Sequence, residues 1–234
     1  MAKRADLDSQ ALAGEGVWAA PAAHLSKGIE ALGLSISAEA QANMLAYLAL
    51  LAKWSKTYNL TAVTDPMAMV DRHLIDSLSM MPWVPRGFIV DAGTGAGLPG
   101  LVLALAGAGE RWALVDSNGK KIRFLRQVCR SLALTSVEPI QGRLETVSFD
   151  ACPEAIVARA LAPLERLVEW ANPWLDQGTV LMAMKADLQE SEILGVSPSY
   201  NVSIKRLNTT DPTVTRCLAL VGHAEAVKRL DNES

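Results

Sequence analysis

Residues 89–100, Ile-Val-Asp-Ala-Gly-Thr-Gly-Ala-Gly-Leu-Pro-Gly, place a short apolar strand directly before a glycine-rich turn. Pro99 stands where the first turn of a helix tolerates a missing N–H, so a helix should follow. Gly93, Gly95 and Gly97 let the backbone pass close to a bound nucleoside, because they have no Cβ. A turn that serves only tight strand–helix packing is the simpler alternative, but four glycines in eight residues favour nucleoside binding.

Two classes of nucleoside cofactor fit such a turn. Gly95-x-Gly97-x-x-Gly100 satisfies the dinucleotide fingerprint, so glycine spacing alone does not choose between them. Asp91 at the strand tip does favour one, because a carboxylate there can face the methionine ammonium group of S-adenosylmethionine. The same carboxylate would repel the pyrophosphate of a dinucleotide. The expected cofactor is therefore S-adenosylmethionine.

A second carboxylate, Asp116, ends the next apolar run, Trp112-Ala-Leu-Val115. It lies about 20 residues beyond the glycine turn, where an acid can accept hydrogen bonds from both ribose hydroxyls of an adenosine. The alternative is a helix N-cap for the segment that starts at Gly119, a role that Asn118 could also fill. Asp116 ends the strand rather than opening the helix, which favours the ribose role.

Strand-like and helical segments alternate after residue 86. Such alternation predicts right-handed crossovers and a mostly parallel sheet of seven strands with helices on both faces. The last two strands have too short a connection for a parallel crossover and should pair antiparallel at one edge. The expected strands are 88–90, 112–115, 137–140, 155–158, 179–184, 202–207 and 213–221. The expected helices of this part are 99–106, 119–134 and 164–175.

The part before residue 86 has a helical pattern. A helix is expected over 37–56 with Ser37 as N-cap, and Asp65-Pro66 supplies the N-cap and first residue of another. The apolar stripe of that second helix should end at Pro82, whereas residues 1–30 show no sustained period and should be loosely packed. The stripe consists of Met67, Val70, Leu74, Leu78 and Met81. These patterns predict an N-terminal helical extension and cap over 1–86 and a cofactor-binding domain over 87–234.

Composition limits the function further. The 234 residues are 50% apolar with a net charge of −3, which suits one domain with a small appendage and argues against a polycationic nucleic-acid coat. Three scattered cysteines and three scattered histidines predict neither a disulfide framework nor a metal site. The N-terminus is charged without an apolar core, and the longest apolar run, 44–52, is too short to span a bilayer. We therefore expect a cytoplasmic protein without membrane contact.

A cluster of cations follows the second strand. Five of the eleven residues 120–130 are basic and none is acidic. On a helix, Ile122, Leu125 and Cys129 form one face while the three arginines line another. A solvated helix face and a phosphate-binding surface beside the cofactor loop both remain open interpretations. The five cations are Lys120, Lys121, Arg123, Arg126 and Arg130.

Four motifs together resemble the small-subunit ribosomal RNA guanine-N7 methyltransferases, the glucose-inhibited division protein B family. They are Asn-Leu-Thr-Ala at 59–62, Arg-His-Leu-Ile-Asp-Ser at 72–77, the glycine run at 91–100 and residues 114–127. The resemblance extends from about residue 37 to residue 185. It implies a Rossmann-like class I methyltransferase fold, S-adenosylmethionine as donor, and a guanosine in the decoding-region loop of 16S rRNA as acceptor.

The resemblance also implies particular contacts. Family cofactor contacts fall on Gly93 and Leu98 in the turn, on Leu144 and Glu145 after the third strand, and on Arg159 at the end of the fourth. Ala158 stands where members more often have Ser, and Leu-Val-Leu at 101–103 replaces Ile-Pro-Leu. Neither difference removes a polar contact that we would assign to catalysis.

Three residues of one helix form a further candidate cluster. Asp76 lies four residues from Arg72 and three from His73, so all three share one side. An intrahelical salt bridge with a surface histidine is the simple interpretation, whereas the resemblance favours a functional cluster beside the cofactor mouth that orders the cap, touches RNA or takes part in catalysis. Lys185, after the fifth strand, could meet an RNA phosphate or merely end its strand in water.

Guanine N7 as target agrees with the residues present. N7 offers a lone pair and loses no proton, so catalysis needs alignment rather than a general base. The Asn/Asp-Pro-Pro-aromatic loop of amino-group methylation is missing after the fourth strand, where the chain has Arg-Ala-Leu-Ala at 159–162. Cys152, the nearest thiol for C5 chemistry, precedes Pro153 and is expected to be structural.

Alternative functions stay open at this point. The chain could methylate another RNA, act as a nicotinamide-dependent oxidoreductase, or be a non-catalytic RNA-binding assembly protein. The favoured partner is 16S rRNA within the small subunit or its precursor, bound by a monomer.

Overall fold

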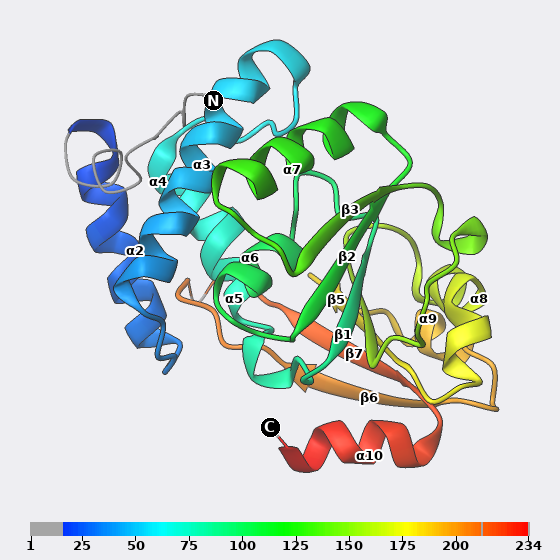
Figure 1. The fold of residues 1–234 in the computed structure, drawn as a ribbon. Coiled ribbons are helices and arrows are strands. Elements are labelled where there is room, and N and C mark those ends of the chain that lie inside the picture. Colours follow the sequence, from blue (N-terminus) through cyan, green and yellow to red (C-terminus); the bar gives the residue numbers. More distant parts are fainter. Residues whose placement is uncertain (1–15, 212, 234) are drawn as a thin grey trace.

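The computed structural model describes residues 16–211 and 213–233 and contains one seven-stranded sheet (Figure 1). The strand order is β3-β2-β1-β4-β5-β7-β6, with β7 antiparallel to both β5 and β6 and the remaining pairs parallel. The predicted sheet and its antiparallel edge are confirmed. The strands are β1 Phe88–Ala92, β2 Arg111–Asp116, β3 Val137–Gln141, β4 Ala155–Arg159, β5 Val180–Lys185, β6 Asn201–Arg206 and β7 Cys217–Gly222.

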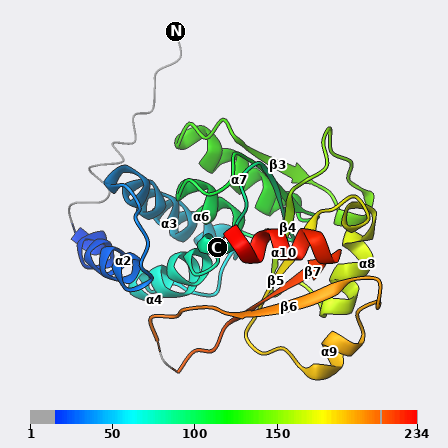
Figure 2. The same cartoon turned by 90° about the horizontal axis from the view of Figure 1, so that it is seen from below.

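Helices cover both faces of the sheet (Figures 1 and 2). Strand residues alternate between two cores: Ile89 and Leu114 pack with the N-terminal helices, α6 and α7, whereas Val90 and Val115 pack with α8. This period-two alternation is the pattern expected of strands buried on both faces. The helices are α2 Ala19–Ala31, α3 Ala38–Tyr58, α4 Pro66–Met69, α5 Asp76–Leu78, α6 Gly100–Leu105, α7 Gly119–Ser131, α8 Leu164–Leu175, α9 Glu190–Leu194 and α10 Ala224–Glu233.

Side-chain caps start the N-terminal helices as expected. Ser37 accepts a hydrogen bond from the Ala40 N–H at 3.1 Å, and Asp65 accepts one from the Ala68 N–H at 2.9 Å. Each cap satisfies one of the N–H groups that a helix start leaves without a partner. Both predicted caps are confirmed.

The expectation of loose packing before residue 30 is wrong where the structure describes the chain. Helix α2 buries Leu25 completely and leaves Ile29 only 4% exposed. Both residues join the same hydrophobic core as α3, α7 and one face of the sheet. Residues 1–15 lie outside the described residues, and the division at residue 86 stays a prediction.

The second N-terminal helix is interrupted. Residues Val70–Ile75 between α4 and α5 form a π-helical turn, which inserts one extra residue and rotates the register. Met69 is therefore fully buried while Met67, expected in the apolar stripe, is 36% exposed. The helix already ends at Leu78, and Pro82 lies in a separate short 3-10 turn. The expectation that Pro82 ends the helix is therefore wrong.

The expected strands and helices did not include α9 and α10. Helix α10 packs over β6 and β7 at the lower end of Figure 1, with Val227 and Leu230 in the core.

Among the described residues, no helix combines the length and apolar character needed to cross a membrane.

Candidate cofactor and acceptor site

A cavity of about 390 Å³ lies beyond the carboxyl ends of β1 and β2. Strand β1 has β2 on one side and β4 on the other, so the cavity lies at the point where the strand order reverses. Open α/β sheets bind ligands at this point, and the volume falls within the usual range for small-molecule sites. The cavity is lined by Gly93, Val115, Asp116, Ser117, Lys121, Gly142, Arg143, Leu144, Glu145, Ala160, Leu161 and Trp170.

The glycine turn needs its glycines for two reasons. Gly93 (φ 66°), Gly95 (φ 61°) and Gly97 (φ 107°) all adopt left-handed backbone conformations. A Cβ at Gly97 would also lie 2.8 Å from the Cβ of Leu101. Gly93 instead faces the cavity, so the turn both packs tightly and leaves room for a ligand.

Asp91 lies beneath the turn, fully buried, rather than on the cavity wall. Its Oδ2 accepts hydrogen bonds from the Thr94 hydroxyl at 2.7 Å and from the Gly100 N–H at 2.8 Å. Its Oδ1 has no hydrogen-bond partner, and burial raises the pKa of the carboxyl group to about 7. An unpaired buried carboxylate oxygen fits a cationic group such as the cofactor's ammonium, and that contact stays a prediction.

Asp116 lies on the cavity wall. Its Oδ2 accepts a hydrogen bond from the Gly95 N–H at 2.9 Å and lies 3.3 Å from the ammonium of Lys121. Its Oδ1 accepts one from the Asn118 N–H at 2.8 Å. Asn118 itself caps α7 by accepting from the Lys120 N–H, so the capping alternative for Asp116 is wrong. The geometry leaves Asp116 available to a ribose.

The remaining predicted cofactor residues divide into two groups. Leu144 and Glu145, in a 3-10 turn after β3, line the cavity. Leu98 and Arg159 do not line it, because Leu98 packs into the core and Arg159 points toward α5. The roles that the resemblance implies for Leu98 and Arg159 stay predictions.

Two hydrophobic wall residues were not expected from the sequence. Leu161, in the loop after β4, remains 37% exposed and lies so close to Gly93 that a Cβ there would be 2.4 Å from its Cδ1. Trp170 reaches the cavity from α8. No motif marks either residue, but a large apolar side chain directly after a strand's carboxyl end is a usable signal for Leu161.

The cluster of Arg72, His73 and Asp76 does not contain the expected intrahelical salt bridge, and its functional role stays a prediction. Asp76 does not pair with Arg72 but binds Arg159 at 2.9 Å and Arg216 at 2.7 Å. Arg72 offers only its carbonyl oxygen, which accepts a hydrogen bond from Arg159, while its side chain is exposed. The intrahelical salt bridge is therefore wrong.

His73 is buried rather than on the surface, at 6% exposure. Its Nε2 lies 3.0 Å from the Thr61 hydroxyl, which joins the motifs at 59–62 and 72–77. Burial, aided by the charge of Arg159, lowers the pKa of His73 to about 4. The imidazole is therefore neutral at physiological pH and holds a loop in place.

The basic helix α7 turns its arginines outward. Arg123, Arg126 and Arg130 are exposed, and none of them forms an ion pair within residues 16–211 and 213–233. The opposite side of the helix faces α3, where Phe124 packs against Trp54 with ring centroids 5.6 Å apart. The three arginines therefore point away from the N-terminal helices.

Two of the six predicted RNA-binding cations lie elsewhere. Lys121 is directed to Asp116 and the cofactor cavity. Lys185 donates hydrogen bonds to the Ala162 carbonyl at 2.9 Å and to Glu192 at 2.6 Å. Because its ammonium is paired with groups of the protein, the expectation that Lys185 merely ends its strand in water is wrong, and its contact with an RNA phosphate stays a prediction.

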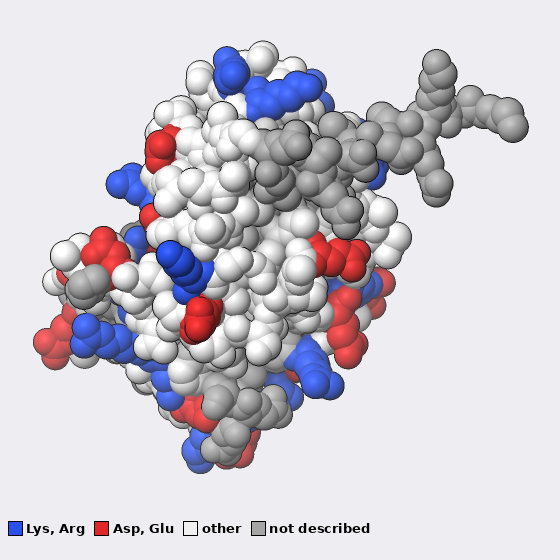
Figure 3. Space-filling view, turned by 90° about the vertical axis from the view of Figure 1, so that its left-hand side faces the viewer, with Lys and Arg blue, Asp and Glu red and all other residues white. Residues whose placement is uncertain are grey.

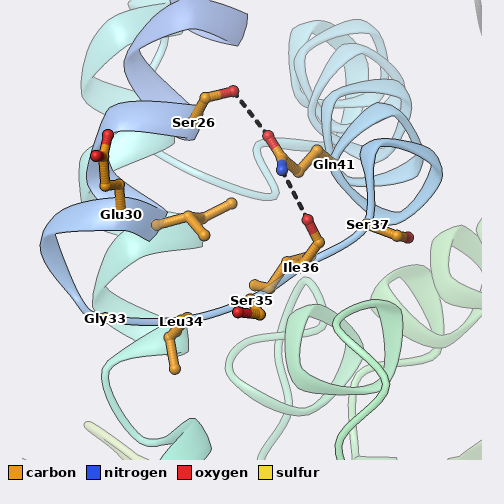
Figure 4. A pocket seen from close by; sticks show the side chains of 9 residues that line it. Ser26, Glu30, Gly33, Leu34, Ser35, Ile36, Ser37 and Gln41 are labelled. Atoms are coloured by element: carbon orange, nitrogen blue, oxygen red, sulfur yellow. Dashed lines mark hydrogen bonds between the residues drawn. The ribbon is translucent and has the colours of Figure 1, made fainter.

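A second hollow of about 600 Å³ lies between α2 and α3 (Figure 4). Gln41 crosses it, accepting a hydrogen bond from Ser26 and donating one to the Ile36 carbonyl. The hollow is wide open and shares no residue with the cofactor cavity. Most of the face that includes α2 is uncharged in Figure 3, so it does not extend the basic surface of α7.

The strand order, with β7 inserted antiparallel between β5 and β6, and the cavity at the reversal point are those of a Rossmann-like methyltransferase fold. The family model of rRNA small subunit methyltransferase G matches residues 40–217, and the chain belongs to this family. The predicted fold, the enzyme class and S-adenosylmethionine as methyl donor are confirmed. The oxidoreductase and assembly-protein alternatives are thereby set aside.

Curated relatives agree with this assignment. A ribosomal RNA small subunit methyltransferase G from Marinobacter nauticus is 42% identical over 86% of this chain and 94% of its own length. One from Chromohalobacter salexigens is 44% identical over 79% and 88%.

Two solved structures share the fold at lower similarity. The structure of MtNAS in complex with MTA and tNA has a TM-score of 0.52 and 16% identity, covering 79% of this chain and 76% of that one. The M. jannaschii TYW2 complex with AdoMet has a TM-score of 0.51 and 14% identity over 64% and 75%.

Proposed function

We propose that this methyltransferase modifies N7 of a guanosine in the decoding-region loop of 16S rRNA. The carrying observation is Asp116, a carboxylate on the cavity wall whose helix-capping role is taken by Asn118. It supports an adenosine-containing donor, and membership of the rRNA small subunit methyltransferase G family supports the RNA acceptor. When bound, the cofactor supplies an electrophilic methyl group on its sulfonium sulfur.

The residues of the chain align this reaction. Asp116 would hold the ribose and Gly93 would permit close approach of the backbone, while Leu144 and Glu145 line the same cavity. Leu161 shields the acceptor side from water. The N7 lone pair would take the methyl group, which would leave the donor sulfur as a neutral thioether and the base with the positive charge, so no proton has to be removed.

The methylation rate should therefore be insensitive to pH above neutrality. Single-turnover rates measured at saturating cofactor between pH 7 and pH 9 are expected to be nearly flat, because no group must lose a proton. His73, with its pKa lowered to about 4, does not titrate in this range. Saturating cofactor removes any effect of Asp91 on cofactor binding, so a steep rise that follows one ionisation would show that a general base takes part.

We propose that the exposed arginine face of α7 binds RNA phosphates. Replacing Arg123, Arg126 or Arg130 with Gln should weaken RNA binding and leave cofactor affinity unchanged. The slope of log affinity against log salt should fall by about 0.7 to 0.9 for each lost phosphate contact, because fewer counterions are released. The slope is measured by fluorescence anisotropy of a labelled 16S fragment.

Lys228→Gln is the matched control, since it removes one charge from an exposed side chain on α10. It should change neither the affinity nor the slope. Substitutions on exposed faces have little effect on stability, so unfolding would not account for a loss of binding. Unchanged slopes in all three arginine variants would mean that the face is only solvated.

We further propose that the acceptor is the RNA within the small subunit or its precursor, that the enzyme is a monomer, and that it acts in the cytoplasm. Transfer of labelled methyl groups from S-adenosylmethionine to naked 16S rRNA, assembled small subunits and large-subunit RNA tests the acceptor. Incorporation into either small-subunit substrate, and not into large-subunit RNA, supports the proposed function. Incorporation only into large-subunit RNA, or none at all, contradicts it.

A further inference from the structure

One carboxylate, Asp76, joins two arginines that are far apart in the sequence. Its Oδ2 accepts a hydrogen bond from Arg159 Nη1 at 2.9 Å and its Oδ1 accepts one from Arg216 Nε at 2.7 Å. Arg159 ends β4, and Arg216 directly precedes β7. Because Cys217 pairs with Lys185 at the end of β5, both arginines lie at the carboxyl edge of the parallel strands.

The two guanidinium groups directly contact a single carboxylate, Asp76, and the buried Asp91 is a second carboxylate within electrostatic range of Arg159. Arg72 adds a third cation, exposed and without an ion pair among the described residues. The side chains of Arg159, Arg216 and Asp76 are 18%, 27% and 11% exposed, so water screens their charges only in part. With Arg72 included, three guanidinium groups face two carboxylates, and this excess of positive charge attracts an anion.

The arginines also have unused hydrogen-bond donors. A guanidinium group has five N–H donors. Arg216 uses Nε for Asp76 and Nη1 for the Thr215 carbonyl, and Arg159 uses Nη1 for Asp76 and the Arg72 carbonyl. No nitrogen of either side chain is among the buried, unpaired polar atoms of the described residues, so the remaining donors reach solvent.

The arginine cluster lies next to the cofactor cavity, which is where the RNA acceptor has to bind. Ala160 and Leu161, the two residues that follow Arg159, line the cofactor cavity. A nucleotide that presents its base to the donor methyl group must therefore bring its own backbone close to this edge. Guanidinium groups suit a phosphate in particular, because their planar fork can donate two parallel hydrogen bonds.

We propose that Arg216 binds a phosphodiester group of the RNA acceptor beside the target nucleotide, and that Asp76 is the positioning residue that holds Arg216 there and Arg159 on the cofactor side. The inference rests on the proposed function, since it takes RNA as the acceptor. It adds a phosphate contact at the opposite side of the cavity from α7. Asp76 thereby connects the donor and acceptor sites through one side chain.

Arg216→Gln tests the contact. The KM for 16S rRNA substrate should rise about tenfold, as expected for loss of a charged hydrogen bond, while kcat changes less and cofactor affinity stays within twofold. The salt slope of RNA binding, measured without turnover, should fall by about 0.7. Arg216→Lys keeps the charge but loses the fork, so it should keep the slope and recover only part of the KM.

Two further variants complete the experiment. Asp76→Asn preserves shape and removes the anchoring charge, so it should raise the KM for RNA although Arg216 is present. Arg229→Gln is the matched control. Arg229 pairs with Glu154, which directly precedes β4 and therefore lies at the amino ends of the parallel strands, away from the cluster. It should leave the KM and the salt slope unchanged.

The possible outcomes separate the two proposals. A folded Arg216→Gln protein with wild-type KM and salt slope overturns the phosphate contact. A variant with lower cofactor affinity or a lower melting temperature, but unchanged KM for RNA and unchanged salt slope, overturns it as well. If Arg216→Gln does not fold, an unchanged KM in Asp76→Asn and Arg216→Lys overturns it instead. Failure of the wild-type enzyme to methylate any small-subunit RNA would refute the proposed function, whereas the salt slopes still report on Arg216.

Discussion

Replacing Asp116 with alanine is expected to weaken S-adenosylmethionine binding by roughly 1–3 kcal/mol, about 5- to 150-fold in affinity. Both carboxylate oxygens lie at the cavity, one bound to the Gly95 N–H and the other to the Asn118 N–H. The variant loses the ribose contact and also one anchor of the glycine turn. Isothermal titration calorimetry measures the affinity, and thermal melting without ligand measures the fold.

Asn118→Ala provides the control for Asp116→Ala. It removes the cap of α7 next to the site, where Asn118 accepts a hydrogen bond from the Lys120 N–H. Loss of a helix cap costs about 1 kcal/mol of stability. We expect this cost with little change in cofactor affinity. Full affinity in Asp116→Ala would refute the ribose assignment.

The affinity for S-adenosylmethionine is expected to rise about tenfold between pH 6 and pH 8. Burial raises the pKa of Asp91 to about 7, and only the ionised carboxylate can pair with the cofactor's ammonium. The fraction of ionised Asp91 grows about tenfold over this interval. Calorimetry at constant ionic strength across the interval measures the effect, and Asp91→Asn should bind weakly at every pH without this rise.

The raised pKa of Asp91 also predicts how the free energy of unfolding of the ligand-free protein depends on pH. Its pKa in the folded protein, about 7, lies above the ordinary value of 3.8, so the folded state binds the proton more tightly. The stabilisation is complete below about pH 4 and is lost as the pH rises through 7. Urea unfolding should show this fall in the wild type and a weaker one in Asp91→Asn. If Asp91→Asn had the same pH dependence as the wild type, both in cofactor binding and in urea unfolding, the raised pKa of Asp91 and its contact with the cofactor would be contradicted.

Local patterns predicted the features that local chemistry controls. The helix from Leu164 to Leu175 has the bounds that its apolar period indicated. Asp116 and the glycine turn were found because strand, turn and helix follow one another directly in sequence. The antiparallel edge followed from the length of one loop.

Features that depend on distant contacts were not predicted. Asp76 finds Arg216 140 residues away, and no spacing rule within one helix could indicate that pair. The π-helical turn at Val70–Ile75 moved Met67 out of the core, because periodicity assumes an uninterrupted helix. Lys185 is held by Glu192 from α9, a helix too short to give a periodic signal.

The most direct test of the central claim is mass mapping of 16S rRNA from cells with and without this protein. We predict one methyl group on a guanosine of the decoding-region loop, present with the wild-type chain and absent without it. Cells that express Asp116→Ala should show reduced methylation at the same nucleotide. Identical methylation of 16S rRNA in cells with and without the protein would contradict the account.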